Sequence, residues 1–289
     1  MANEVTTTTA DDLSLAAELL ASAIMPHFYG NLVAGALVRS ADIGGAPTKA
    51  KDFPITPGLT ASSIAEAVDL TNTPFVTSKV TLTVGEAGLM LTITDLLSMS
   101  DIVSDEYYAA EMGKAMALKF NTDVLSLSSG FSGSTGSTGL DLTEAYIIAG
   151  EVTLASNGVP PPYRGVLHPQ QWADLIADVG TTINPASGPG AQTSREATND
   201  WSVPSVGPVG SAYGVEWYTS HLVPTANAGA DRLGMIVAPQ HAIGHVSKWD
   251  VRVEPERDAS LRAREIVVTA CYAVGELRDA AGIGVLSGA

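Results

Sequence analysis

Residues 44–77 limit the fold of this chain more than any other stretch, because they are too poor in apolar side chains to build a core of their own. The segment is rich in Gly, Pro, Ser and Thr, and its prolines are Pro47, Pro54, Pro57 and Pro74. Proline cannot donate to a β-ladder, so any strand here is an edge strand. Unstructured loops of this length are uncommon inside a compact domain. We therefore expect the segment either to be disordered or to lie extended on another surface.

The composition of the whole chain points in the same direction. Its 289 residues carry 31 acidic and 15 basic side chains, which gives a net charge of −16, and 45% of the residues are apolar while only 16% are charged. A soluble domain usually has about a quarter of its residues charged. The longest apolar runs fall well short of the roughly 18 residues that a membrane helix needs. These numbers exclude a membrane span and favour a surface largely covered by other copies of the chain.

Simple counts argue against three further kinds of protein: a secreted protein, a protein with disulfides or a thiolate zinc site, and a nucleic-acid-binding protein. The N-terminus lacks a basic start followed by an apolar core, so we expect no secretory signal and synthesis in the cytosol. The single cysteine, Cys271, excludes an internal disulfide and a thiolate zinc site, and its apolar surroundings predict a buried thiol in a strand. The isoelectric point near 4.5 argues against a broad basic face that grips nucleic acid.

Periodicity predicts the elements of the first half. Asp11 and Asp12 precede a short amphipathic helix that reaches Ile24 and ends at Pro26. Residues 79–84 and 89–94 alternate between apolar and polar side chains, as strands do, with an interruption at residues 85–88, and Thr94 or Asp95 caps a short helix. Apolar residues then recur at steps of three and four over residues 104–128, which predicts one helix of roughly 37 Å.

The second half reads as a mixed region followed by strands. We expect helices over residues 142–156 and 169–178, strands over residues 165–168, 214–220 and 233–238, and a long loop over residues 180–209. The last strands, residues 246–254, 264–274 and 282–286, read as a meander. Six cationic residues lie among or beside them with six acidic ones, which predicts cross-strand charge pairs. They are Lys248, Arg252, Arg257, Arg262, Arg264 and Arg278, with Asp250, Glu254, Glu256, Asp258, Glu265 and Glu276.

The search for catalytic or binding chemistry yields weak candidates. The glycine-rich stretch over residues 130–139 follows a helix and lacks the lysine of a phosphate loop. His241 and His245 have the spacing of two metal ligands on a helix, but no adjacent glutamate accompanies them and Gly244 weakens a helix there. His168 precedes Pro169, where its ring is expected to cap a turn. No Gly-x-Ser-x-Gly elbow occurs. We therefore predict no catalytic, cofactor-binding or metal-binding residues, and no cofactor.

The order of these parts resembles a known family. An arm, a proline-rich excursion, an alternating strand, one long helix, a mixed middle and closing strands are similar to the major capsid proteins of tailed bacteriophages, which have the Hong Kong 97 fold. The resemblance covers most of the chain, and the stretches that carry it are residues 63–70, 75–84, 91–97, 105–127, 163–175, 214–224 and 235–242.

The resemblance implies an α+β fold and a division of the chain. Residues 1–43 would be an N-terminal arm, residues 44–77 an extended loop, and residues 78–139 a peripheral domain that includes a spine helix over residues 104–128. Residues 140–245 would be an axial domain, and residues 246–289 the closing strands of both domains. The loop and the arm would bury their apolar residues on neighbouring subunits, which explains how a segment without its own core becomes ordered.

The implied function is that of a structural subunit, not an enzyme, which self-assembles through pentamers and hexamers into the icosahedral head shell of a virion. Assembly would take place in the host cytoplasm. The shell would enclose DNA without reading its sequence, and the acidic net charge agrees with a lumen that does not hold the genome. The chain begins almost directly at the arm, so a scaffolding protein, if used, is expected to be separate or already removed. Portal and decoration proteins are further partners that the family allows. Lys49, Lys51 and Lys79 lie near the extended loop, but no motif fixes a partner and we predict no covalent cross-link.

Three other functions remain open at this stage. An encapsulin-type nanocompartment shell has the same architecture and encloses a cargo enzyme. A soluble α/β enzyme would use the glycine-rich stretch or the His241 and His245 pair, and would be a compact monomer or small oligomer with a well-formed pocket. A tail-tube or surface-layer subunit would be more uniformly β, and the long helix counts against it.

Overall fold

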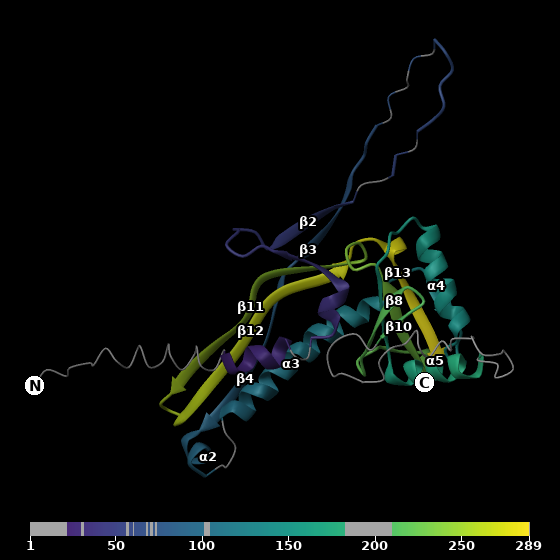
Figure 1. The fold of residues 1–289 in the computed structure, drawn as a ribbon. Helices are drawn as coiled ribbons and strands as arrows, with labels where there is room; N and C mark the ends of the chain where they lie inside the picture. The colour runs from purple at the N-terminus through teal and green to yellow at the C-terminus, as the bar shows by residue number, and fades with distance from the viewer. Residues whose placement is uncertain are drawn as a thin grey trace, which may run out of the picture.

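The computed structural model describes residues 22–29, 32–55, 58–59, 61–67, 69, 72, 74–100, 105–182 and 210–288. Within these residues the strands form a four-stranded sheet, a seven-stranded sheet and a two-stranded ribbon. Figure 1 shows the long helix α3 running beside the four-stranded sheet, while the second sheet and its helices gather around the C-terminus. The mixture of separate sheets and helices is the α+β class that the sequence predicts.

The four-stranded sheet has the order β1 (Val38–Asp42), β11 (Ile243–Asp258), β12 (Ala263–Glu276) and β4 (Gly85–Thr94). The spine helix α3 (Asp105–Ser126) packs on it and continues into the short turn η2 (Leu127–Ser129). This agrees with the long helix predicted over residues 104–128. The shared core consists of buried apolar side chains from helix and sheet, among them Ile93, Met112, Met116, Val251, Val253, Ile266 and Val268.

A helical segment over residues 22–29 lies against α3, and it corrects one prediction. The helix runs through Pro26 and does not end there. Proline inside a helix costs about 3 kcal/mol, but tertiary packing offsets that cost, because Ile24 is fully buried against the spine helix. Gly113 permits the close crossing, since a Cβ there would lie 2.7 Å from the backbone oxygen of Ile24. The part of the predicted helix before residue 22 lies outside the described residues.

The proline-rich segment forms part of a projecting hairpin. The strands β2 (Ala50–Ile55) and β3 (Ser78–Thr83) pair in antiparallel register from Ala50↔Thr83 to Ile55↔Ser78. Between them the chain extends far from both sheets (Figure 1). Each strand of a two-stranded ribbon has a free edge, so Pro54 lies where its missing N–H costs no ladder bond.

The expected interruption at residues 85–88 is wrong. This stretch is the start of β4, and its residues pair with β12 from Gly85↔Tyr272 to Gly88↔Thr269. Gly88 stays in the ladder because the partner backbone comes very close: a Cβ there would lie 2.7 Å from the carbonyl oxygen of Val268. Gly88 therefore marks a close backbone contact and not a break in the strand. After β4, the short helix α2 (Asp95–Ser100) forms as predicted.

The seven-stranded sheet has the order β5, β13, β10, β6, β8 and β7, with β9 paired to β10. Its strands are β5 (Ser134–Gly136), β6 (Tyr163–Leu167), β7 (Gly210–Ala212), β8 (Val215–Thr219), β9 (Thr225–Ala226), β10 (Asp231–Val237) and β13 (Gly282–Gly288). The helices α4 (Glu144–Ser156) and α5 (Pro169–Thr182) belong to this part of the fold, together with the short turns η1 (Ala34–Leu37), η3 (Asn227–Gly229) and η4 (Asp279–Ala281). Both helices lie where the sequence predicts them, although α5 continues four residues further. The loop expected over residues 180–209 lies mostly outside the described residues.

Two predictions about the C-terminal strands are corrected. The closing strands are not one meander, because β11 and β12 form a hairpin in the first sheet while β13 pairs with β10 in the second. The register of that hairpin also places Glu256 opposite Glu265 and Arg257 opposite Arg264, so like charges face each other. Burial of the apolar face sets this register, and a shift by one residue would expose that face.

Candidate assembly surfaces

The projecting hairpin has a buried root and exposed apolar side chains along the segment beyond it. At the root, Phe53 is buried against β11, and Asp52 accepts hydrogen bonds of 2.6 Å from both Lys79 Nζ and Thr81 Oγ1. These hydrogen bonds lower the pKa of the Asp52 carboxyl. Beyond the root, four large apolar side chains are exposed by 45–71%: Leu59, Ile64, Phe75 and Val76. Exposed apolar side chains on a segment that projects from a buried root form a surface suited to contact with another chain.

A second apolar surface lies at the far end of the four-stranded sheet. Leu96 and Met99 of α2 are 79% and 87% exposed, and Leu261 in the turn between β11 and β12 is 58% exposed. The backbone N–H of Asp95 donates to the carbonyl of Arg262 at 2.9 Å, so helix and turn are joined. The sequence pattern did not predict this surface, although the run Leu96-Leu97 in a short helix was a usable signal.

The charge pairing at this end differs from the prediction. Arg257 forms a two-pronged ion pair with the carboxylate of Asp95, at 2.5 and 2.7 Å, rather than pairing across the hairpin. Hydrogen bonding from Arg257 lowers the pKa of Asp95. The Thr94 hydroxyl accepts from the Leu97 N–H at 3.3 Å, which confirms Thr94 as the helix cap. Arg252 lies 3.5 Å from Glu254 on its own strand.

The metal-site geometry considered for His241 and His245 is wrong. His241 lies in an exposed turn and His245 lies in β11, so no helix presents the two rings on one face. His245 instead packs edge-on against Phe120, with ring centroids 5.0 Å apart. Gly244 lies in the same strand and packs tightly against Leu277, where a Cβ would come within 2.8 Å of the side chain.

The glycine-rich stretch is not a phosphate loop, and part of it is not a loop at all. Residues 134–136 form β5 and pair in parallel with β13. Gly136 has a φ of +98°, and a Cβ there would lie 1.8 Å from the carbonyl oxygen of Leu286. Gly136 therefore permits a close backbone approach between β5 and β13.

Two other residues lie as predicted. His168 Nδ1 accepts a hydrogen bond from the Gln170 N–H at 3.2 Å, which confirms the turn cap, and burial lowers the pKa of the ring. Cys271 is buried in β12, and burial raises the pKa of its thiol. Neither environment activates a nucleophile or a base.

In the ranges that the structure describes, no group of three or more His, Cys, Asp or Glu side chains is placed to hold a metal ion. Over those ranges there is also no helix with the length and apolar character needed to cross a bilayer. The surfaces with the clearest chemical character are thus the apolar ones.

Comparison with known proteins agrees with this picture. Residues 77–284 match the family model described as phage capsid protein. The fold resembles the capsid of cyanophage P-SCSP1u, with 16% identity, a TM-score of 0.64, and 88% of this chain and 87% of that one covered. It resembles the capsid of cyanophage Pam1 equally, with 12% identity, a TM-score of 0.64 and 88% of each chain covered. A virus-like particle from Pyrococcus furiosus also matches, with 10% identity, a TM-score of 0.57, and 93% and 98% covered.

No curated protein matches the chain by sequence. At these identities the solved structures establish the fold, which is the Hong Kong 97-like capsid fold. The family model covers more than two thirds of the chain and includes β3, the spine helix and most of both sheets. The chain is therefore a member of the phage capsid protein family.

Proposed function

We propose that the chain is the major subunit of an icosahedral phage head, which self-assembles through pentamers and hexamers and encloses the genome. The observation that carries this proposal is the projecting hairpin, whose exposed apolar side chains have no core of their own within the described chain. Side chains such as Phe75 and Val76 lose contact with water only if a neighbouring subunit covers them.

The division of the chain that we infer from the sequence assigns each segment a place in such a shell. The arm of residues 1–43 and the loop of residues 44–77 would contact neighbours. The peripheral domain of residues 78–139 would form the lattice framework with the spine helix, and residues 140–245 would pack around the five-fold and six-fold axes. Residues 246–289 would complete both domains, which agrees with β12 and β13 lying in different sheets.

The role is structural and the place of the chain is the virion. Scaffolding, portal and decoration proteins would be separate partners, and assembly would occur in the host cytoplasm. DNA would lie against the inner surface without sequence-specific contacts. The net charge of −16 supports this, because a protein that neutralises few phosphates binds DNA weakly.

A shell that holds cargo other than a genome is the second candidate. The virus-like particle from Pyrococcus furiosus has a similar fold over 93% of this chain and 98% of that one, so the fold suits a shell of either kind. The match to the phage capsid protein family favours the genome shell.

The test is negative-stain microscopy of the purified chain and of lysate from cells that express it, with and without a co-expressed scaffolding protein. Closed icosahedral particles are expected in at least one of these samples. A monodisperse monomer at high concentration under every condition contradicts the proposal. Analysis of the particle contents then separates the candidates, because an encapsulated enzyme with a bound targeting peptide favours the cargo shell.

A further inference from the structure

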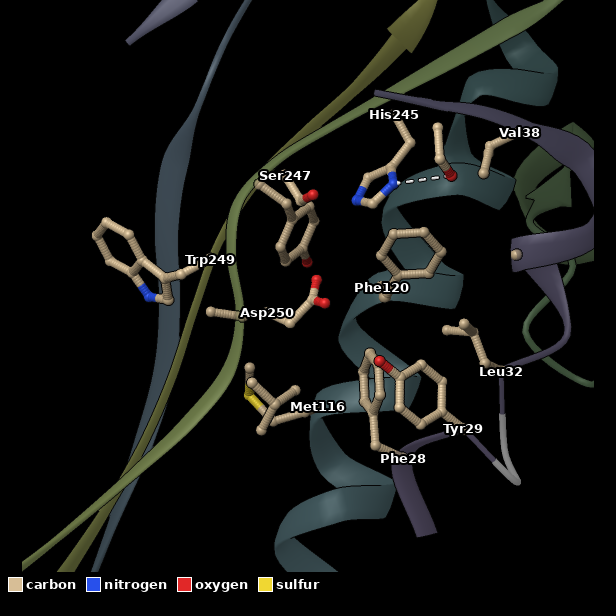
Figure 2. A pocket seen from close by; sticks show the side chains of 15 residues that line it. Phe28, Tyr29, Leu32, Val38, Met116, Phe120, His245, Ser247, Trp249 and Asp250 are labelled. Atoms are coloured by element: carbon tan, nitrogen blue, oxygen red, sulfur yellow. Dashed lines mark hydrogen bonds between the residues drawn. The ribbon is translucent and has the colours of Figure 1, made fainter. Parts of the chain in front are cut away.

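A cavity of about 410 Å³ lies between the helix of residues 22–29, the spine helix α3 and β11 (Figure 2). Its volume falls in the range of small-molecule sites. Its lining residues include five with Phe, Tyr or Trp rings: Phe28, Tyr29, Phe120, Trp249 and Tyr272. Phe28 and Tyr29 meet edge to face with ring centroids 5.3 Å apart, and Phe120 lies 5.4 Å from Tyr272. Aromatic rings are therefore a prominent part of the wall.

The cavity coincides with an irregular stretch of β11. Ser247 pairs with Tyr272 and Arg252 pairs with Thr269, so β11 advances five residues while β12 advances three. Two bulges take up the difference. Bulges bend a strand and redirect its side chains. Asp250 lies in this stretch, and Figure 2 shows its carboxylate directed toward the aromatic rings of the cavity.

The Asp250 carboxylate gives the cavity a negative charge. Burial raises the pKa of the Tyr29 phenol, and the Asp250 charge raises it further. Burial lowers the pKa of His245, and the Asp250 charge opposes that shift but is the smaller effect. Both groups therefore lie within its reach. His245 is neutral at pH 7 because its pKa is lowered, and no Lys or Arg is among the described residues that line the cavity.

We propose that this cavity binds a small organic ammonium ion, with the cation held by the aromatic faces and Asp250 and the apolar body against Leu32 and Met116. Aromatic rings attract cations through the negative potential of their faces, and an ammonium group near a carboxylate gains further charge attraction. A neutral molecule of the same shape gains only the apolar contact. This inference does not depend on shell formation.

The experiment compares 2-phenylethylamine, a cation at pH 7, with neutral 2-phenylethanol as probes of the purified full chain. Binding is measured by isothermal titration, and by the rise in unfolding temperature that a ligand of the native state produces. The cation should bind about 3- to 30-fold more tightly than the alcohol, the range that cation–π and charge attraction give. Equal affinity, or no binding of either probe, overturns the proposal.

Variants test the two parts of the site. Asp250→Asn should remove most of the preference for the cation, and Tyr29→Leu should reduce it while leaving the alcohol bound. Tyr29 is 52% exposed, so its replacement leaves the core intact. Glu66→Gln is the matched control, because it removes the same charge from an exposed residue between β2 and β3 that does not line the cavity. If Glu66→Gln lowers the preference as much as Asp250→Asn, the attraction is non-specific and the proposal fails.

Discussion

The phenol of Tyr272 donates a hydrogen bond of 2.8 Å to Asp123 Oδ2, and this contact joins β12 of the four-stranded sheet to the spine helix. Burial and this hydrogen bond raise the pKa of the Tyr272 phenol, so it remains protonated and able to donate at neutral pH. The same ring packs against Phe120 and His245. Tyr272 thus couples the sheet, the helix and the cavity beside them.

Tyr272→Phe removes the hydrogen bond but keeps the ring. We expect the free energy of unfolding to fall by about 1–2 kcal/mol, because a half-buried carboxylate loses a donor. Denaturant unfolding followed by circular dichroism measures the change. The control is Lys119→Met, which removes the exposed 2.6 Å ion pair to the same Asp123 and should cost less than about 0.5 kcal/mol. Equal effects would show that the phenol is not the important partner.

His245→Gln should make the protein less sensitive to acid. Burial lowers the pKa of His245 below the unfolded value of about 6.5. The unfolded chain therefore binds the proton first, and stability is lost as the pH falls below about 6.5, by up to about 1.4 kcal/mol per pH unit for this group. The groups that face the ring are Asp250, which opposes the shift, Tyr272, Phe120 and the Ser40 hydroxyl.

The measurement for that variant is urea unfolding at several values between pH 7.5 and about pH 5, the window set by the lowered pKa. The free energy of unfolding should fall less steeply with decreasing pH in the variant than in the parent chain. His168 provides a comparison, since its pKa is also lowered. Its replacement should independently reduce the dependence of the free energy of unfolding on pH. An unchanged slope in His245→Gln would mean that the ring titrates alike in the folded and unfolded chains.

Gly136→Ala should destabilise the chain far more than Gly139→Ala. Both glycines have positive φ, +98° and +69°, but a Cβ at Gly136 would overlap the backbone of Leu286, whereas nothing lies within 4 Å of one at Gly139. We expect losses of about 3–4 kcal/mol and about 1–2 kcal/mol respectively, because only the first adds a steric clash to the backbone strain. Thermal unfolding compares the two, and similar losses would show that β5 moves aside readily.

Phe75→Asp should block assembly without unfolding the subunit. Phe75 is 52% exposed on the projecting hairpin, so its loss removes no core packing, while a charge there opposes burial under a neighbour. Sedimentation and negative-stain microscopy should show few or no particles and a normal circular dichroism spectrum. Ser62→Asp adds the same charge to an exposed residue of the same loop and should retain more particles. Full assembly of Phe75→Asp would contradict a covered hairpin.

The spine helix, α2 and α4 show where sequence reasoning succeeds. Their signals are local: apolar residues at steps of three and four, a cap at Thr94, and the stop at Asn157 and Gly158, where Gly158 has a φ of +68°. Such features depend on neighbours within one or two helical turns. The helix over residues 22–29 shows the limit, because packing on α3 outweighs the local signal of Pro26.

The apolar surfaces were predicted only in part. The exposed side chains of the projecting hairpin follow from its composition, since a segment rich in proline and glycine forms no core. The apolar end at Leu96, Met99 and Leu261 joins residues about 160 positions apart, and the hydrogen bond from Asp95 to Arg262 that brings them together follows no sequence period. The cavity beside Asp250 likewise depends on where β11 bulges against β12.

By itself, the sequence determined the kinds and order of the elements, the low surface charge and the need for contacts beyond the chain. The charge and the composition are totals over the whole chain, and the elements follow from patterns within a few neighbouring positions. Only the tertiary structure decided that β13 leaves the hairpin for the second sheet, that like charges face each other at Glu256 and Glu265, and that His245 enters an aromatic cavity. The physical reason is that strand pairing and register follow the burial of apolar faces across the whole fold, and the energy of a distant contact leaves no local pattern.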